Sequence, residues 1–217
     1  MAGGFFFVDT PRCTACRGCQ VACKAWHKLP GVKTRQWGSP QNPKDLGPDT
    51  YRLVRFREYN QKDKAVRDYF SDACRHCLDP PCKDAADQYV KGAVVIDRSG
   101  AVIHTEKTAL LGENAEEVMV ACPFNIPRKD PGTGILRKCN MCFDRLKAGL
   151  EPSCAKACPV GAINFGSEKS VMALAQSRLA TAKRLYGHTA QLLNADEVRV
   201  IYLIADEAEK YYEFATY

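Results

Sequence analysis

The sequence lacks the long apolar run that a membrane-spanning helix requires. Such a helix needs roughly 20 predominantly apolar residues, and no segment of that length and character occurs in the 217 residues. Residues 1–8 contain only Phe5–Val8 as an apolar run and no basic segment of the kind that opens a secretory signal. The sequence therefore predicts a chain with no membrane span, which would need another protein to be exported.

The sequence also lacks the usual signatures of an active site. It contains no recognisable nucleophile–base pair, no glycine-rich loop that would cradle a phosphate and no paired acids in a catalytic setting. No Cys-x2-Cys-His motif is present, which excludes covalent c-type haem. No basic cluster is interleaved with stacking aromatic residues, so we expect no nucleic-acid partner.

Cysteine, in contrast, is abundant, with 12 residues in the chain. Eleven of them stand in three groups and the twelfth precedes a proline: Cys13-x2-Cys16-x2-Cys19-x3-Cys23, Cys74-x2-Cys77-x4-Cys82, Cys139-x2-Cys142-x11-Cys154-x3-Cys158-Pro159, and Cys122-Pro123. Bacterial ferredoxins use Cys-x2-Cys-x2-Cys-x3-Cys-Pro, in which the fourth cysteine ligates the other cluster of the pair. The first and last groups are thus typical of two motifs that together bind a pair of electron-transferring clusters.

Three other uses of the cysteines compete with this interpretation. Disulfides are disfavoured because cysteines three residues apart pair poorly with each other. A zinc-stabilised binding module is a better alternative, since Cys139-x2-Cys142 resembles one half of a zinc site. A catalytic iron–sulfur enzyme would need an open coordination site, which twelve cysteines in fours do not leave.

The formal charge of +6 has an explanation in such cofactors. An oxidised [4Fe–4S] core with four thiolates carries about −2. Three clusters would bring the net charge to roughly zero, so the basic excess matches the charge of the cofactors.

Several elements follow from the pattern of apolar and turn residues. We expect a surface excursion at 28–50, a strand at 51–59, a hairpin at 93–104, helices at 113–121 and 167–186, a strand at 198–204 and a short helix at 207–214. Ser167 should cap the long helix and Gly187 should end it. Its apolar positions are Val171, Ala175, Leu179, Ala182 and Tyr186.

Four stretches carry a resemblance to a known family: Cys16-Arg-Gly-Cys19-Gln-Val-Ala-Cys23-Lys-Ala-Trp26, Cys74-Arg-His-Cys77-Leu-Asp-Pro-Pro-Cys82, Ala121-Cys-Pro-Phe-Asn-Ile-Pro-Arg128 and Lys138-Cys-Asn-Met-Cys-Phe-Asp-Arg145. The chain resembles the four-cluster ferredoxin-type electron-transfer subunits of molybdopterin oxidoreductases, above all the small subunit of soluble tungsten or molybdenum formate dehydrogenases. The resemblance covers roughly residues 5–166.

The chain departs from this family at four positions. Where the family has the cysteines of a fourth cluster, this sequence has Ala86, Gly112, Ala115 and Val118. The nested pairing of the family then implies three [4Fe–4S] clusters with three ligand sets: set A (Cys13, Cys16, Cys19, Cys158), set B (Cys23, Cys139, Cys142, Cys154) and set C (Cys74, Cys77, Cys82, Cys122). No cysteine is left over, which is what the deletion of one complete cluster would produce.

The resemblance implies an α+β fold with two ferredoxin-like subdomains, insertions and a C-terminal helix–strand extension. The first subdomain is expected at 1–27 plus 129–166 with two clusters, and the second at 51–128 with one. The excursion at 28–50 and the extension at 167–217 complete the chain.

The resemblance also implies a function. The chain would be a non-catalytic subunit that relays electrons from a large catalytic subunit, which holds a tungsten or molybdenum bis-pterin cofactor and its own cluster, to a c-type cytochrome or another acceptor. Formate is the expected substrate of the complex, and small subunits of other molybdopterin oxidoreductases remain an alternative. We expect a periplasmic location through co-export with the catalytic subunit, with a cytoplasmic complex as the alternative.

Overall fold

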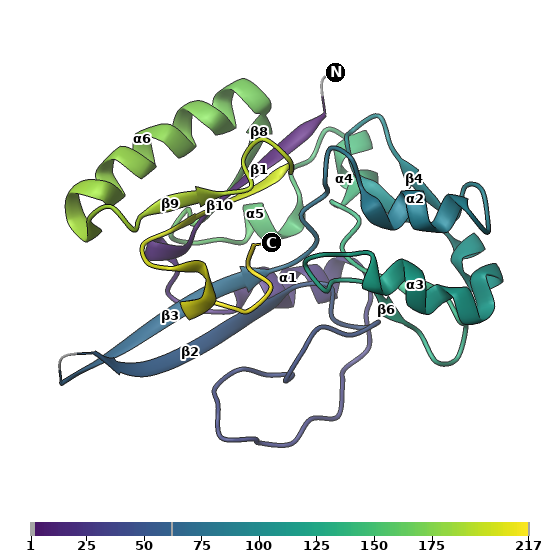
Figure 1. Cartoon of the computed structure of the whole chain (residues 1–217), viewed down its shortest axis with the longest axis horizontal. Helices are drawn as coiled ribbons and strands as arrows, with labels where there is room; N and C mark the ends of the chain where they lie inside the picture. Colours follow the sequence, from purple (N-terminus) through teal and green to yellow (C-terminus); the bar gives the residue numbers. More distant parts are fainter. Residues whose placement is uncertain (1–2, 62, 217) are drawn as a thin grey trace.

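A four-stranded sheet joins the two ends of the chain in the computed structural model, which describes residues 3–61 and 63–216 (Figure 1). Its strands are β1 (Gly4–Asp9), β8 (Ile163–Ser167), β9 (Gln191–Leu193) and β10 (Val200–Ile204), in the order β8-β1-β10-β9. β1 runs parallel to β10, with Phe6 opposite Val200, and antiparallel to β8. The predicted strand at 198–204 is thus confirmed as β10, and it lies beside the first strand of the chain.

The two faces of this sheet have different neighbours. Side chains alternate along a strand, so Phe5 and Phe7 pack under helix α6 (Glu168–Tyr186), which covers one face of the sheet (Figure 1). Phe6 and Val8 point the other way, into a core that includes Cys19 and Cys154, among others. The sheet and α6 therefore close off one side of the cysteine-bearing region from solvent.

The predicted long helix is confirmed with its two ends. The Ser167 hydroxyl accepts a hydrogen bond from the Ser170 amide, which caps the first turn of α6. Gly187 follows the last residue with φ +91°, a conformation that favours glycine. Of the five expected apolar positions, Tyr186 is an exception, because its side chain is half exposed.

Three two-stranded ribbons complete the strands: β2 (Leu53–Gln61) with β3 (Lys64–Asp72), β4 (Val94–Ile96) with β5 (Val102–His104), and β6 (Arg128–Lys129) with β7 (Leu136–Arg137). β2 confirms the strand predicted at 51–59, although its partner β3 was not predicted. β4 and β5 confirm the hairpin at 93–104, with Gly100 at φ +81° in its turn.

The remaining helices are short: α1 (Gly18–Trp26), α2 (Pro81–Asp87), α3 (Ala115–Val120), α4 (Phe143–Lys147), α5 (Ser153–Lys156), and the 3-10 segments η1 (Thr10–Arg12), η2 (Glu106–Asn114) and η3 (Ala208–Lys210). α3 confirms the helix predicted at 113–121. The helix predicted at 207–214 is wrong, because this segment makes only the single turn η3. Its rings pack on Phe70 instead, with Tyr211 and Tyr212 about 6.5 Å from it between centroids.

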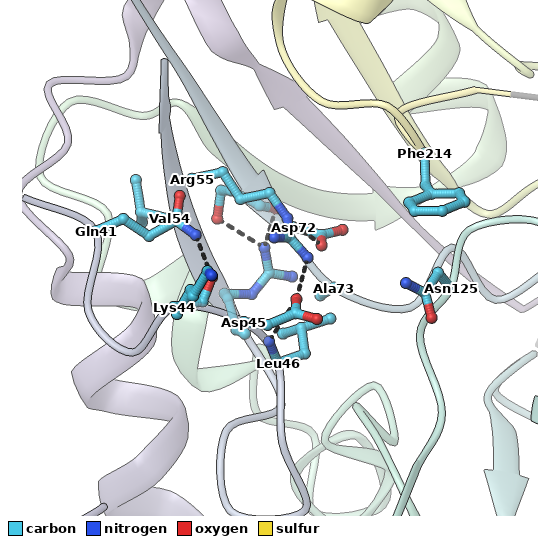
Figure 2. A network of polar contacts seen from close by, with 12 residues as sticks. Gln41, Lys44, Asp45, Leu46, Val54, Arg55, Asp72, Ala73, Asn125 and Phe214 are labelled. Carbon is cyan, nitrogen blue, oxygen red and sulfur yellow. Dashed lines mark hydrogen bonds and ion pairs between the residues drawn. The ribbon is translucent and has the colours of Figure 1, made fainter. Parts of the chain in front are cut away.

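The excursion at 28–50 forms neither helix nor strand. Polar contacts join it to β2 and to β6 (Figure 2). Asp45 pairs with Arg55 of β2 at 2.7 Å and with Arg128 of β6 at 2.8 Å. The Gln41 side chain accepts a hydrogen bond from the Phe56 amide. The mixture of helices and small sheets confirms the α+β class, while the subdomain boundaries stay a prediction.

Candidate metal centres

All twelve cysteines lie among the described residues, and all are free thiols. Most are buried, and Cys16 alone is classed as exposed within the described ranges. A buried group of free thiols at this density needs a chemical explanation, because free cysteine usually occurs singly in a core. The arrangement of the thiols provides one.

The four thiols of set A line one pocket. Cys13, Cys16 and Cys19 come from the loop between η1 and α1 and from the first turn of α1, while Cys158 follows α5. The contact between α1 and α5 brings the two segments together. The side chains of Val8, Val54 and Ile163 complete the apolar lining of the cavity.

The four thiols of set C line a second pocket. Cys74 and Cys77 follow β3, Cys82 lies in the first turn of α2, and Cys122 follows α3. α2 packs against α3, which places Cys82 and Cys122 on the same side of the cavity. Pro80, Pro81 and Pro123 belong to the lining and restrict the backbone of the loops that carry these cysteines.

The thiols of set B are all buried and lie close to one another. Burial raises the pKa of Cys23 well above its ordinary value, and the neighbouring thiols Cys139, Cys154 and Cys142 raise it further. Thiolates are the form in which cysteine ligates metal, so assembly of a metal centre here must release protons.

Set B lies between the other two sets. Burial raises the pKa of Cys139 to about 11 against the opposing charge of Arg52, and both Cys154 of set B and Cys74 of set C add to this rise. Burial likewise raises the pKa of Cys154, with Cys19 of set A among the thiols that contribute. Packing agrees with this, since Cys154 of set B shares one buried cluster with Cys19 of set A, and Cys139 of set B shares another with Cys74 of set C. Set B therefore adjoins both of the other sets.

Three of the cysteine loops share a left-handed backbone conformation. Residues two positions after a cysteine adopt left-handed conformations at Ala15 (φ +54°), His76 (φ +49°) and Met141 (φ +62°). The amides of His76 and Met141 each point at the sulfur of the cysteine two residues earlier, at 3.4 Å. Such strained residues persist where function requires them, and amides directed at sulfur are among the groups that set the potential of an iron–sulfur cluster.

The sets do not resemble single-ion sites. In the described ranges, no group of three or more His, Cys, Asp or Glu side chains is arranged to hold one metal ion. The four sulfurs of set A and the four of set C each line one pocket, and the four thiols of set B are buried. Four thiols around a space fit a [4Fe–4S] cluster, which takes one cysteine at each of its four irons.

Three polar side chains that the sequence analysis did not single out lie beside the sulfurs. The Ser71 hydroxyl is 3.4 Å from the sulfur of Cys19. The Nε2 of His27 and the hydroxyl of Ser153 are each 3.6 Å from the sulfur of Cys142. Ser153 could have been noticed in the sequence, because it directly precedes Cys154. Ser71 and His27 reach the sulfurs through the tertiary fold alone, so the sequence contained no signal for them.

His76, which lies between Cys74 and Cys77, has a packing role. It is fully buried, and its Nδ1 accepts a hydrogen bond from the amide of Val102 at 3.0 Å. Burial lowers its pKa well below the ordinary value, and the charge of Lys138 lowers it further. The imidazole is therefore a neutral part of the core at the foot of the β4–β5 hairpin.

Three sets of thiols in an α+β fold define the class of this protein as an iron–sulfur electron-transfer chain. A family model described as a 4Fe-4S dicluster domain matches residues 65–168. The chain is 51% identical over 213 residues to the formate dehydrogenase 2 subunit beta (cytochrome c-553) of Nitratidesulfovibrio vulgaris, with 97% of each chain covered. It is 46% identical over 211 residues to the formate dehydrogenase subunit beta of Megalodesulfovibrio gigas, again with 97% of each covered.

A more distant relative is the formate dehydrogenase-O iron-sulfur subunit of Escherichia coli. It is 35% identical over 176 residues, which cover 81% of this chain and 57% of that relative. The chain belongs to the family of formate dehydrogenase beta, or iron–sulfur, subunits. The expected resemblance is thereby confirmed, and so is the binding of [4Fe–4S] clusters. Within residues 3–61 and 63–216, no helix is both long and apolar enough to cross a bilayer.

Proposed function

We propose that this chain binds three [4Fe–4S] clusters and relays electrons from a molybdopterin-containing catalytic subunit that oxidises formate to an external acceptor. The cavities that sets A and C surround carry this proposal, together with the buried set B between them. Each cluster, when bound, takes up and passes on one electron. The protein holds the clusters in series and excludes water from the central one.

The proposed number of clusters rests on the four positions at which the family would have further cysteines. Ala86, Ala115 and Val118 are fully buried and belong to one apolar core with Leu111 and Leu136. The fourth position, Gly112, is exposed at a kink with φ +58°. Close-packed apolar side chains fill this region, which supports the absence of a fourth cluster.

This apolar core also bears on the path of the electrons. Among the described cysteines it includes Cys82 of set C and no member of sets A or B. The proposed missing cluster would thus have been at the end of the series, beyond set C. Its loss leaves the spacing between the other three unchanged.

The partners are proposed from the relatives. One relative is named for cytochrome c-553 and all three are formate dehydrogenase subunits. We therefore propose formate as the substrate of the complex, a large subunit with a tungsten or molybdenum bis-pterin cofactor as the electron donor, and a c-type cytochrome as the acceptor. A periplasmic complex, exported with the catalytic subunit, is also proposed.

Metal analysis of the anaerobically purified protein tests the cluster content. We expect about twelve irons and about twelve acid-labile sulfides per chain, because three cubane clusters contain four of each. Bound zinc without sulfide would instead indicate a zinc-stabilised binding module. About eight or sixteen irons would contradict the number three.

Purification from the native cells tests the partners and the location. A pterin-containing subunit should co-purify, and formate should reduce the clusters of the complex, which then reoxidise on addition of a c-type cytochrome. Fractionation should place the complex in the periplasm, and recovery in the cytoplasm would contradict that part of the proposal. A complex that formate does not reduce would point to another molybdopterin oxidoreductase.

A further inference from the structure

Three cations are buried in the described part of the chain without an ion pair to a carboxylate: Arg52, Lys138 and Arg145, the last of them 8% exposed. Arg52 is 2% exposed and Lys138 is 6% exposed. Arg145 donates to the carbonyl of Glu151 and lies 4.3 Å from the ring centre of Trp26. The remaining two buried cations, Arg55 and Arg75, share Asp72 at 2.8 Å. Over the described part of the chain, neither Arg52 nor Lys138 has an ion pair with any carboxylate. A buried charge is costly unless an opposite charge compensates it.

Lys138 lies between sets B and C. Its Nζ donates hydrogen bonds to the carbonyls of Val102 at 2.6 Å and Cys139 at 3.1 Å. Its side chain lines the cavity that the thiols of set C surround, alongside Cys74 and Cys82. The following residue, Cys139, belongs to set B. The ammonium group therefore faces one set while its backbone is part of the other.

Arg52 lies between sets A and B. One guanidinium nitrogen donates to the hydroxyl of Ser71 at 2.9 Å and to the Ser71 carbonyl at 3.1 Å. The same hydroxyl is 3.4 Å from the sulfur of Cys19 in set A. On the other side, the charge of Arg52 opposes the rise in pKa of Cys139 and Cys154 of set B.

The negative charge that compensates these cations must come from the metal centres. An oxidised cluster with four thiolates carries about −2, and its reduction adds a further negative charge. A fixed cation nearby stabilises the reduced form more than the oxidised form, because the Coulomb attraction grows with the charge of the cluster. The cation therefore raises the reduction potential of each cluster beside it.

We propose that Arg52 and Lys138 are the resident counter-charges of the clusters and set their potentials in pairs. Arg52 raises the potentials of the clusters at sets A and B, and Lys138 raises those at sets B and C. The central cluster is influenced by both cations. This inference rests on the proposed three-cluster function. It adds the residues that set the reduction potentials of the three clusters.

Redox titration followed by electron paramagnetic resonance tests which two clusters each cation influences. The protein is purified anaerobically in its complex with the catalytic partner. In Lys138→Met, the midpoint potentials of the clusters at sets B and C should fall. At a fixed potential, the ratio of reduced to oxidised cluster should decrease tenfold or more, which corresponds to a shift of 59 mV for one electron. The cluster at set A should shift much less. In Arg52→Met, the clusters at sets A and B should shift and the cluster at set C should not.

Charge-conserving variants and surface controls separate charge from structure. Lys138→Arg and Arg52→Lys keep the positive charge and should keep potentials near those of the wild type. Lys183→Met and Arg184→Met remove exposed charges from α6, whose buried face packs on the far side of the sheet, and should leave all three potentials unchanged.

The pattern of shifts decides the outcome. Unchanged potentials, an equal shift of all three, or shifts in the charge-conserving variants as large as in the neutral ones would overturn the proposal. A second readout applies if the neutral variants Lys138→Met and Arg52→Met lose iron for lack of a cation. In that case, retention of iron by Lys138→Arg and Arg52→Lys supports the counter-charge role. Equal loss of iron from the neutral and the charge-conserving variants contradicts it. A wild-type protein without three clusters would contradict the proposed function itself, whereas a three-cluster protein with unmoved potentials would contradict this inference alone.

Discussion

At the scale of single residues, Asp72 is the main electrostatic anchor of the core outside the thiol sets. It is fully buried, and its two carboxylate oxygens bind Arg75 and Arg55, each at 2.8 Å. The guanidinium of Arg75 lies within about 5 Å of the ring centres of Phe70, Phe124 and Tyr202. These contacts fix the end of β3, directly before Cys74 of set C.

Asp72→Asn should therefore destabilise the protein strongly. The substitution leaves two guanidinium groups without their shared counter-charge, and removal of one partner from a buried pair costs about 3–5 kcal/mol of unfolding free energy. Anaerobic thermal unfolding should show a melting temperature lowered by roughly 10 °C or more. Glu58→Gln is the control, because it breaks the exposed pair with Arg67 and should change the melting temperature little.

Cys158→Ala tests the ligand sets at the same scale. Cys158 contributes to the cavity of set A from a segment far along the chain from Cys13, Cys16 and Cys19. The variant should lose or convert the cluster at set A and retain the other two, with iron falling to about eight per chain if that cluster is lost entirely. Cys77→Ala should remove a different paramagnetic signal, from set C. Loss of the same signal in both variants would contradict the assignment.

At the scale of elements, α6 and the sheet protect the thiol sets from one side. Ser167 caps the first turn of the helix, and Val171, Ala175 and Ala182 are buried against the sheet. Much of its other surface is exposed and charged, so its stability comes from one apolar stripe and from its ends.

Ser167→Ala should weaken this helix by about 1 kcal/mol, because the substitution removes the hydroxyl that caps the amide of Ser170. Chemical denaturation that is monitored under anaerobic conditions would detect the change as a lower midpoint. Ser177→Ala, in the exposed middle of the same helix, should be neutral or slightly stabilising, since alanine is the better helix former. Equal destabilisation in both variants would argue against the cap.

The excursion at 28–50 depends on Asp45 for its attachment. Burial opposes ionisation of Asp45, but the hydrogen bonds from Arg128 and Arg55 outweigh it and hold the pKa below its ordinary value. The carboxylate is thus ionised well below neutral pH, and the stability that it contributes is lost only as the pH falls through this lowered pKa. Figure 2 shows Asp45 joined to Arg55.

Asp45→Asn should loosen the excursion without unfolding the core. Trypsin should cleave at the exposed Lys33 and Arg35 up to about fivefold faster, the ratio that corresponds to about 1 kcal/mol for a surface pair. The difference from the wild type should be the same at pH 6 and pH 8, because both values lie above the titration of Asp45. Asp49→Asn, in the same segment, is the control. A difference that vanished at pH 6 would contradict the assignment.

At the scale of the whole molecule, the clusters and the fold depend on each other. The thiols of set B together with Arg52 and Lys138 are buried, and sets A and C each include partly exposed thiols. Without bound iron, these cations lose their compensating charge and the thiols have no common ligand. Metal binding free energy is then largely folding free energy.

Removal of iron by a chelator under oxidising conditions should therefore abolish the tertiary structure. Near-ultraviolet circular dichroism should be lost together with the visible absorption, and both should return only on anaerobic reconstitution with iron and sulfide. Zinc offers a control, since it can bind thiolates but cannot fill a site with four irons. An apoprotein with native near-ultraviolet dichroism would contradict this interdependence.

The sequence analysis succeeded where the signal is local and failed where it is not. Ser167, the apolar stripe of α6 and the β4–β5 hairpin follow from spacing and turn residues, and the structure confirms them. The segment at 207–214 has helical composition, yet contacts of Tyr211 and Tyr212 with Phe70 hold it in another conformation. The position of Trp26 and Trp37 is likewise decided by tertiary contacts: both are about 40% exposed, and their indole nitrogens donate to Asp144 and to the Gln41 carbonyl.

The sequence by itself determined the class of cofactor, because the spacing of cysteines along a loop decides which thiols can reach one cluster. It also determined which family the chain resembles and where one set of ligands is missing. Only the tertiary structure decided that set B lies between sets A and C, that apolar side chains fill the region of Ala86 and Val118, and that Arg52 and Lys138 are buried without carboxylates. The reason is physical: the burial and neighbours of a charge depend on segments distant in the chain, and spacing along the sequence carries no information about them.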